Sequence, residues 1–250
     1  MDPEPFLSFV IPAFNEEKRI AGTLDTLLAY LGRQEYRAEV LVVDDGSADA
    51  TAGRVRELAR GRSDLRLLEA PHRGKGHAVK IGMLAARGQY RFLCDADLAM
   101  PVEELAKFLP PALVGVEVAV GSREAPGAHR YGEPGHRHLM GRVFNWVVRA
   151  LAVRSIRDTQ CGFKCFTASS ARHLFSQQRL DGFGFDVEVL FLAQRSGLSI
   201  REVPIEWRYQ QESKVRPLRD TLRMLRDVLQ VRWNHLAGRY RLAQEAGAEP

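Results

Sequence analysis

Short apolar runs alternate with amphipathic helical patterns along the first half of the chain, and this alternation is the strongest constraint on the fold. Runs such as FLSFVIPAF and AEVLVVDDGS, rich in Val, Leu and Phe, are each followed by a segment with helical periodicity. Strands of this composition are buried on both faces, as in a parallel sheet covered by helices. The sequence therefore predicts an α/β fold with a mixed, mainly parallel sheet flanked by helices.

The second half predicts further elements. Residues 124–138 are rich in Gly, Pro, His and Arg and predict a long loop, followed by a helix over roughly 139–152. A strand is expected around 162–166, then helices over 169–178 and 186–197, and one strand over 198–209. A basic amphipathic helix is expected over about 217–241. We expect residues 1–215 to form one domain, and residues 216–250 to form a C-terminal basic amphipathic helix and tail.

Composition and charge narrow the class of protein. The 250 residues are 45% hydrophobic and 27% charged, which is typical of a globular protein. The net charge of +5 permits an anionic partner such as a nucleotide or a phospholipid surface. Three cysteines are too few for a disulfide framework, so we expect reduced thiols and a cytoplasmic protein. The acidic start is a poor signal peptide, and no apolar stretch reaches the roughly 18 residues of a membrane span.

Polar side chains follow five of the predicted strands, at the point where each strand ends. They lie in the segments PAFNE, DDGS, RGKG, DAD and GSR, which are residues 12–16, 44–47, 73–76, 95–97 and 121–123. Ligands of parallel α/β sheets bind at the C-terminal ends of the strands. Five polar strand ends therefore predict a ligand cleft, although neither G-x-G-x-x-G nor G-x-x-x-x-G-K-[ST] occurs in the chain.

Asp95 and Asp97, at the end of FLCDAD, need an electrostatic explanation. Two close buried carboxylates repel, so one must take up a proton or both must bind a cation. Hard oxygen ligands suit Mg²⁺ or Mn²⁺, which bind one or two carboxylates together with substrate phosphates. The alternative is an acidic turn with solvated side chains. The position after a buried strand, with Arg73 and Lys75 on a neighbouring loop, favours the cation site.

Motifs in both halves resemble one family. VIPAFNEEKRI, LVVDDGSADAT, RGKGHAVKIGM and FLCDADLAMP resemble, in order and spacing, the nucleotide-sugar domain of inverting glycosyltransferases of family 2, which have a GT-A fold. GSRE, RHLMGRVFNWVV, IRDTQCGFKCF and FGFDVEVLFLAQ resemble dolichyl-phosphate β-glucosyltransferases and their polyprenyl-phosphate relatives. The resemblance covers about residues 6–215. It implies an enzyme that transfers a hexose, glucose from UDP-glucose, to a polyprenyl or dolichyl phosphate.

The resemblance also implies roles for individual residues. Asp97, ahead of Asp95, is the more direct metal ligand, and Arg123 meets the acceptor phosphate. The donor sugar faces residues 186–188. The implied nucleotide-sugar site consists of Pro12, Ala13, Asn15, Glu16, Asp44, Asp45, Lys75, Gly76, Asp95, Ala96 and Gln160. Further candidates for the acceptor phosphate are Arg137, Arg208 and Lys214.

The implied chemistry needs little acid–base catalysis. A lipid phosphate monoester has a second pKa of about 6 and is largely dianionic at neutral pH, so arginines that position it replace a strong base. Direct displacement inverts the anomeric carbon. With a hydroxyl acceptor, Glu188 would instead be the base.

Three alternatives stay open. One is a GDP-mannose-dependent polyprenyl-phosphate mannosyltransferase, although Ala99 stands where those relatives often have Gln. Another is a family-2 transferase with a non-lipid acceptor. The third is a sugar-nucleotide-binding module without catalysis. Nucleic acid is not an expected partner, because the carboxylate-lined strand ends would repel phosphate without a metal.

The pattern of the C-terminal helix predicts a contact with a membrane surface. Among seven arginines, apolar residues recur at helical spacing: Leu218, Leu222, Leu225, Leu229, Trp233, Leu236 and Tyr240. Such a helix lies in a membrane interface, or alternatively packs on the protein's own core or on a second copy in a homodimer. The segment 140–153 is a second interfacial candidate. We expect a peripheral protein at the cytoplasmic membrane face.

Overall fold

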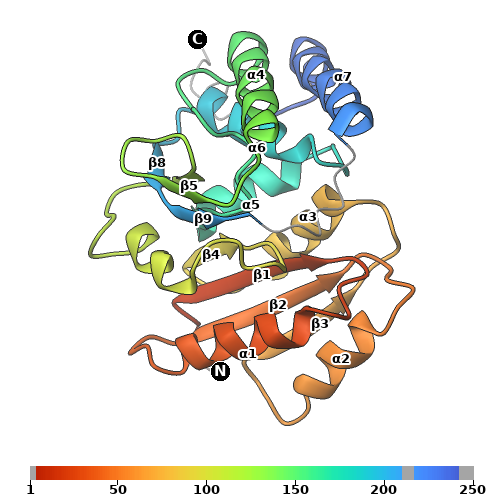
Figure 1. Cartoon of the computed structure of the whole chain (residues 1–250), viewed down its shortest axis with the longest axis vertical. Coiled ribbons are helices and arrows are strands. Elements are labelled where there is room, and N and C mark those ends of the chain that lie inside the picture. The colour runs from red at the N-terminus through yellow and green to blue at the C-terminus, as the bar shows by residue number, and fades with distance from the viewer. Residues whose placement is uncertain (1–3, 210–216, 242–250) are drawn as a thin grey trace, which may run out of the picture.

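A seven-stranded sheet forms the centre of the protein (Figure 1). The computed structural model describes residues 4–209 and 217–241, without the side chains of residues 136, 137, 139, 140, 143, 144 and 217–222. In spatial order the strands are β3 (Leu65–Glu69), β2 (Ala38–Asp44), β1 (Leu7–Ala13), β4 (Tyr90–Leu93), β7 (Lys164–Thr167), β5 (Val118–Ser122) and β8 (Ile200–Pro204). All neighbours are parallel except β7, which is antiparallel to β4 and β5. The predicted mixed, mainly parallel α/β fold is confirmed.

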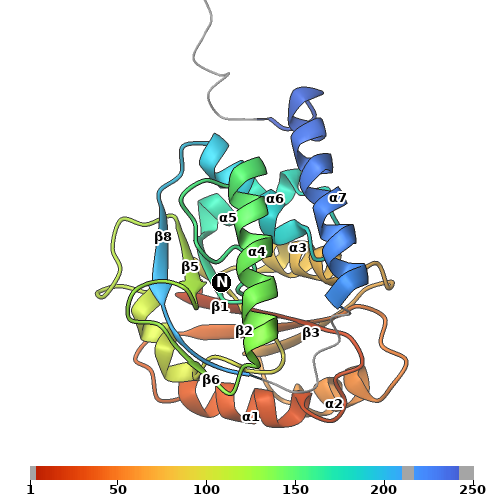
Figure 2. The same ribbon diagram turned by 45° about the horizontal axis from the view of Figure 1, so that its top comes forward.

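Helices cover both faces of this sheet. One face carries α1 (Ile20–Leu31), α2 (Thr51–Leu58) and the 3-10 helix η1 (Val102–Phe108). The other carries α3 (Lys75–Ala85), α5 (Ala168–Gln177) and α6 (Phe185–Arg195). Beyond α6, α4 (Gly135–Leu151) and α7 (Pro217–Leu236) pack side by side (Figure 1, Figure 2).

The central strands are apolar on both faces, as the sequence pattern predicts. Successive residues of a strand point to opposite sides of the sheet. Phe9 and Ile11 of β1 therefore pack in one core with Leu24 of α1, whereas Val10 between them packs in the other core with Met83 of α3. Two buried cores back to back explain why the strands read as continuous apolar runs.

Two predicted segments differ from the structure. The expected loop over 124–138 contains β6 (His129–Tyr131) and the first turn of α4. The single strand expected over 198–209 is two strands, β8 and β9 (Glu206–Arg208). β9 leaves the main sheet and pairs with β6 in a second, two-stranded sheet. A short strand whose partner lies far along the chain leaves no local pattern, which is why β6 was missed.

α7 contacts α4 and α6 through one face and exposes the other. Val231 is fully buried in the core shared with α6. Leu229, Trp233 and Leu236 are 59%, 61% and 75% exposed, while Tyr240 beyond the helix is buried. The predicted apolar stripe is thus divided between core and surface, and the side chains of residues 218 and 222 lie outside the described part. No helix of the described residues has the length and apolar character needed to cross a membrane.

Candidate active site

The C-terminal ends of β2, β4 and β5 meet at one edge of the sheet, because these strands run in the same direction. Asp44, Asp95 and Arg123 lie at or just beyond these ends, as the polar strand ends predict. Lys164 reaches the same edge from β7. Because β7 is antiparallel, its first residue pairs with Leu93, the last residue of β4.

Lys75 and Asp95 form an ion pair at this edge. Lys75 Nζ lies 2.6 Å from Asp95 Oδ1, and the two side chains are 20% and 31% exposed. Lys75 opens α3 directly after Gly74, whose φ of +126° is one that residues with a side chain rarely adopt. Burial alone would lower the pKa of Lys75, but the carboxylates of Asp95 and Asp186 outweigh it and raise the pKa. Lys75 is therefore a cation at neutral pH.

Asp97 lies beside Asp95 in the loop after β4, where its Oδ1 accepts the N–H of Ala99 at 3.1 Å. Burial, together with the charge of Asp95, raises the pKa of Asp97. Burial and repulsion between neighbouring carboxylates both disfavour the charged form. Within residues 4–209 and 217–241, no group of three or more His, Cys, Asp or Glu side chains forms a metal cage. Two carboxylates fit Mg²⁺ or Mn²⁺ when diphosphate oxygens and water supply the other ligands.

Gly162 packs directly against the Asp95 carboxylate. A Cβ added at this glycine would lie 2.0 Å from Asp95 Oδ2 and 2.5 Å from its Cγ. Atoms cannot approach so closely, so the position of Asp95 depends on a residue without a side chain at 162. Gly162 belongs to the motif DTQCGFK, residues 158–164, within the segment IRDTQCGFKCF. The motif does not predict the contact with Asp95.

Lys164 and Asp186 form a second ion pair behind the first. Lys164 Nζ lies 2.5 Å from Asp186 Oδ1, and the side chains are only 1% and 4% exposed. Burial raises the pKa of Asp186, while Lys164 and Lys75 act in the opposite direction. Cations and anions thus alternate from Lys164 through Asp186 and Lys75 to Asp95. Asp186 was predicted to face the donor sugar. Lys164 was not predicted, and its only signal was its place in the DTQCGFK motif.

Arg123 is held by Asp158 and Trp207. Its Nε and Nη2 donate to the two oxygens of Asp158 at 2.7 and 2.9 Å, and its guanidinium lies 5.2 Å from the centroid of the Trp207 ring. Burial alone would raise the pKa of Asp158, but Arg123 lowers it to about 2. The fork is therefore fixed in orientation, with Nη1 outside the pair. Asp158 was not predicted, although it also belongs to the DTQCGFK motif.

The neighbouring carboxylates of Asp44 and Asp45 have different hydrogen-bond partners. Asp44 Oδ2 accepts the N–H of Ser47 at 3.0 Å, while its Oδ1 is buried without a hydrogen-bond partner among the described residues. The two oxygens of Asp45 accept the backbone N–H groups of Arg73 and Gly74 at 3.0 and 2.9 Å. Asp45 therefore holds the loop before Lys75 in place. Asp44 keeps an acceptor that a ligand can use.

The loop after β1 is tied to the loop after β2. The N–H of Asn15 donates to Ser47 Oγ at 2.8 Å, and its Oδ1 accepts the N–H of Ala48 at 2.9 Å. Asn15 adopts a left-handed φ of 53°, which asparagine tolerates better than most residues. The ring of Phe14 stacks on His72, with centroids 4.1 Å apart. Polar backbone groups and the rings of Phe14 and His72 therefore line one side of this edge of the sheet.

The remaining predicted donor residues lie in the same region. Gly76 packs against the backbone of residues 180–182, where a Cβ would meet the Leu180 carbonyl at 2.6 Å. Gln160 has a buried Nε2 without a partner among the described residues. Pro12 and Ala13 lie at the end of β1. Glu16 forms an ion pair with Arg19 at 2.8 Å. The carbonyl of Ala96 accepts the Thr23 hydroxyl at 2.6 Å.

The hydrogen bonds of Glu188 lead away from the Lys75–Asp95 pair and give no support to its predicted place beside the donor sugar or as the base for a hydroxyl acceptor. The side chain is fully buried, and its oxygens accept the N–H groups of Arg179 and Leu180 and the hydroxyl of Tyr240, the last at 2.7 Å. Two residues past Asp186 on a helix is about 200° around its axis. The two carboxylates therefore point in opposite directions.

The other predicted acceptor residues are Arg208, Arg137 and Lys214, of which the structure describes the side chain of Arg208 only. The N–H of Arg208 in β9 donates to the carbonyl of Ala99 at 2.8 Å, which places this exposed arginine beside the Asp97 loop. The side chain of Arg137 in α4, and the whole of Lys214, lie outside the described part of the chain.

The sequence matches a family model and several known proteins. The model of Glycosyl transferase family 2 matches residues 8–180. The dolichyl-phosphate beta-glucosyltransferase of Drosophila melanogaster is 38% identical over 260 residues, covering 96% of this chain and 78% of that protein. The human protein of that name is 35% identical, covering 97% and 79%, and the Saccharomyces cerevisiae protein is 34% identical, covering 96% and 78%.

Solved structures share the fold. Glucosyl-3-phosphoglycerate synthase from Mycobacterium tuberculosis, in complex with Mn²⁺, UDP and glucosyl-3-phosphoglycerate, superposes with a TM-score of 0.69 at 21% identity, covering 95% of this chain and 81% of that one. Its UDP complex gives 0.68 at 20% identity, covering 91% and 80%. At this identity the likeness shows the GT-A fold alone. Together with the family match, it follows that the chain belongs to glycosyl transferase family 2 and is a nucleotide-sugar-dependent glycosyltransferase.

Proposed function

We propose that this enzyme transfers glucose from UDP-glucose to a polyprenyl phosphate such as dolichyl phosphate, with Mg²⁺ or Mn²⁺ as cofactor. The observation that carries the proposal is that Lys75, Asp95, Asp97 and the Arg123–Asp158 pair share one sheet edge. It is supported by relatives at 34–38% identity that are named dolichyl-phosphate beta-glucosyltransferases. The same names favour glucose over mannose.

On the donor side, Asp97 and Asp95 would hold the divalent cation against the diphosphate of the sugar nucleotide. When bound, the cation supplies Lewis-acid stabilisation of the charge that develops on the leaving diphosphate. Lys75 adds a positive charge at the same place. Asp44 Oδ1 and Gln160 Nε2, both buried without partners among the described residues, are suited to the nucleoside and the sugar. The Mycobacterium tuberculosis synthase was solved with Mn²⁺ and UDP-glucose.

On the acceptor side, Arg123 would bind the phosphate through Nη1, while Asp158 and Trp207 keep its guanidinium in place. Arg208, which lies beside the Asp97 loop, would be a second cation for the same phosphate. Arginines match phosphate oxygens in a fixed geometry, so they position the nucleophile as well as neutralise part of its charge.

The reaction is a single displacement. An oxygen of the acceptor phosphate attacks the anomeric carbon and forms the new C–O bond. The bond from that carbon to the diphosphate oxygen breaks, and UDP leaves with the electron pair. Attack from the opposite face converts an α-linked donor into a β-linked product. No proton has to be removed from a dianionic phosphate, which agrees with a Glu188 carboxylate already engaged by Arg179, Leu180 and Tyr240.

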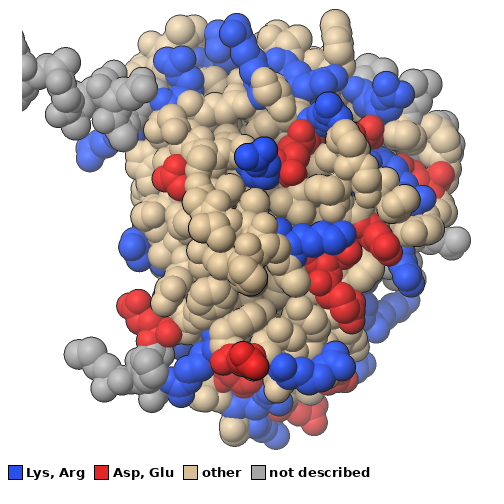
Figure 3. Space-filling model, turned by 90° about the vertical axis from the view of Figure 1, so that its left-hand side faces the viewer, with Lys and Arg blue, Asp and Glu red and all other residues tan. Residues whose placement is uncertain are grey.

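We also propose a division of labour along the chain. Residues 1–215 would carry out transfer, and residues 216–250 would supply a helix for a membrane surface. α7 carries the exposed Leu229, Trp233 and Leu236, and the adjoining α4 carries the exposed Trp146 and Leu151. In Figure 3, Lys and Arg gather along the upper edge of the face, toward the helical end of the molecule. Apolar, aromatic and basic side chains together suit a peripheral interface with anionic lipid.

Membrane contact is tested by flotation with vesicles of phosphatidylcholine and phosphatidylserine. Leu229→Gln combined with Trp233→Gln should reduce the floated fraction, because both exposed apolar side chains are lost. The matched control is Leu84→Gln with Val114→Gln, which are 41% and 72% exposed on other parts of the surface. Equal flotation of both double variants and the unaltered protein would remove α7 from the interface.

The function itself is tested with a donor panel. UDP-glucose, UDP-galactose and GDP-mannose are each incubated with and without polyprenyl phosphate, in Mg²⁺, Mn²⁺ or EDTA. We expect a glucosyl lipid from UDP-glucose alone, only with the acceptor, and none in EDTA. Free glucose formed at the same rate without the acceptor would contradict the lipid-phosphate assignment.

A further inference from the structure

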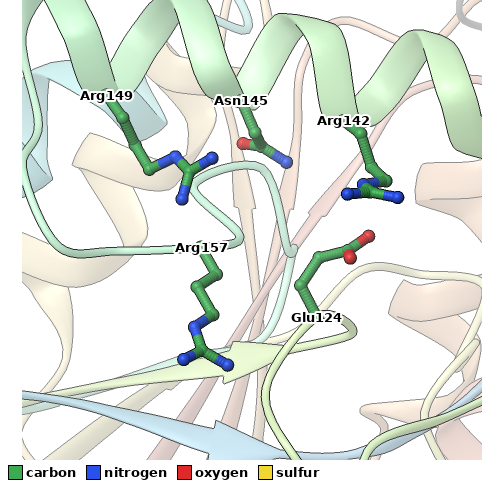
Figure 4. Close-up of a pocket in the computed structure, with 5 residues that line it drawn as sticks. All are labelled: Glu124, Arg142, Asn145, Arg149 and Arg157. Carbon is green, nitrogen blue, oxygen red and sulfur yellow. The ribbon is translucent and has the colours of Figure 1, made fainter.

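A polar pocket lies outside the edge of the sheet described above, between α4, the loop after β5 and the segment just before Asp158. It encloses about 180 Å³ and is lined by Glu124, Arg142, Asn145, Arg149 and Arg157 (Figure 4). None of these residues belongs to the proposed donor or acceptor sites. The space is enough for a phosphate group with accompanying water.

The pocket carries positive charge that is not paired with a carboxylate in the part of the chain that the structure describes. Among the described residues, no carboxylate lies within 4.0 Å of the guanidinium groups of Arg142, Arg149 and Arg157. The carboxylate of Glu124, which also lines the pocket, is already engaged by Arg130 and, at 3.1 Å, by His138. In Figure 4 the side chains of Arg142 and Arg149 extend from α4 into the pocket, whereas the Arg157 side chain runs away from the helix. Two guanidinium groups without a carboxylate partner among the described residues favour an anion between them.

Two hydrogen-bond donors at the pocket lack an acceptor. Arg149 Nε is buried and has no partner among the described residues. A shielded donor of this kind is uncommon, because leaving it unpaired is costly. Asn145 Oδ1 accepts both the N–H and the hydroxyl of Thr159, at 3.1 and 2.8 Å. This fixes the amide, and Figure 4 shows its nitrogen on the side of Arg142 and Glu124.

The arrangement is built into rigid elements. Residues 142, 145 and 149 lie three and four positions apart, so they share one face of α4. Figure 4 shows these three side chains pointing from the helix toward Arg157 and Glu124. The backbone of Arg157 is held by Glu202, whose Oε1 accepts its N–H at 3.0 Å. The pocket is therefore organised before a ligand arrives.

We propose that this pocket binds a phosphate group that belongs to neither the sugar donor nor the lipid acceptor. The guanidinium groups of Arg142 and Arg149 and the amide nitrogen of Asn145 donate hydrogen bonds only, and the guanidinium fork fits phosphate oxygens. The phosphate comes either from an anionic phospholipid headgroup or from a soluble phosphate ester. Trp146, 64% exposed on the same helix and next to Asn145, is where a headgroup at a membrane surface would carry its acyl chains.

The test uses the full chain and two probes: soluble dihexanoyl phosphatidic acid, and phosphatidylcholine vesicles with or without phosphatidic acid. Arg142→Gln with Arg149→Gln removes two guanidinium groups from the pocket and keeps good helix formers. The control, Arg172→Gln with Arg195→Gln, removes the same charge from exposed sites in α5 and α6. Circular dichroism and thermal unfolding establish that both variants fold.

We expect the pocket variant to bind the soluble probe about tenfold or more weakly than the control, a factor that long-range charge alone does not produce. Parallel loss of vesicle binding identifies the source as a lipid headgroup. Unchanged vesicle binding identifies a soluble phosphate ester. Equal binding of the soluble probe by the pocket variant and the control would overturn the proposal. Glucosyl transfer in detergent, followed in the same samples, reports separately on the proposed function, because the pocket shares no residue with that site.

Discussion

The ammonium group of Lys75 lies 2.6 Å from the carboxylate of Asp95, and this contact joins the start of α3 to the loop after β4. Gly162, from a third segment, packs against the other oxygen of the same carboxylate. Asp95 is therefore held from two sides, whereas Asp97 is held by one backbone N–H at 3.1 Å. This difference agrees with the expectation that Asp97 is the more direct metal ligand.

Replacing Asp97 with Asn removes a charge while keeping the shape of the side chain. We expect glucosyl transfer to fall at least about 100-fold, because metal-ion stabilisation of the leaving group contributes several kcal/mol. Transfer is measured with radiolabelled UDP-glucose over a range of Mn²⁺ concentrations. Asp25→Asn, an exposed position on α1, is the control and should leave the rate unchanged. A normal rate in Asp97→Asn would remove Asp97 from the metal site.

Gly162→Ala tests whether the Asp95 position matters. The new Cβ would lie 2.0 Å from Asp95 Oδ2, so the carboxylate must leave the position in which it pairs with Lys75. We expect weaker Mn²⁺ dependence and transfer reduced about tenfold or more. In Gly53→Ala the added Cβ has no atom within 4 Å, and since the residue lies in α2 this change should stabilise the fold by about 0.5–1 kcal/mol. Equal activity of the two variants would contradict the proposed contact.

Arg123→Lys separates charge from geometry. Lysine keeps the positive charge but cannot reproduce the two-point contact with Asp158. We expect the KM for polyprenyl phosphate to rise about tenfold while binding of UDP-glucose is unchanged. Arg62→Lys is a matched control, because Arg62 makes a similar two-point contact with Asp64 on the exposed surface. A change in UDP-glucose binding instead would place Arg123 on the donor side.

The Asp158 carboxylate should make stability depend on pH in acid. Its folded pKa of about 2 lies below the ordinary 3.8, so folding favours the ionised form. The resulting stabilisation, about 2 kcal/mol, is complete above pH ~4 and is lost as the pH falls toward 2. Urea unfolding at a series of pH values measures it. Asp158→Asn, although less stable throughout because Arg123 loses its counter-ion, should show a decline about 2 kcal/mol smaller over that range.

Tyr240→Phe tests how the C-terminal segment is anchored. The tyrosine hydroxyl donates to buried Glu188 at 2.7 Å, and its loss should cost about 1–2 kcal/mol of unfolding free energy at pH 8. Burial already raises the pKa of Glu188, and removing a donor to the carboxylate raises it further. The destabilisation should therefore shrink as the pH falls toward 4.5 and Glu188 becomes protonated. Tyr131→Phe, at a hydroxyl on the exposed β6, should have no effect at either pH.

Much of the fold and part of the site could be predicted from local patterns. Apolar runs followed by helical periodicity predict the mainly parallel sheet, because strands buried on two faces cannot carry polar residues except at their ends. The polar residues at those ends then include Asp44, Lys75, Asp95, Asp97 and Arg123. Parallel direction alone brings the ends of β2, β4 and β5 together.

Local patterns could not predict which charged groups meet. Asp186 and Glu188 look alike in the sequence, yet one pairs with Lys164 and the other with Tyr240. Asp158 carries no sign that its partner is Arg123. The apolar stripe of α7 reads as one face, but the helix buries Val231 and exposes Trp233.

The sequence by itself determined the fold class, the edge of the sheet at which we propose that a ligand binds, and the carboxylates suited to a metal. Tertiary structure alone decided which charges are paired, which carboxylate is turned into the core, and that Gly162 sets the position of Asp95. The reason is physical. Periodicity and burial depend on neighbours a few residues away, whereas an ion pair or a close packing contact depends on segments that only the folded chain brings together.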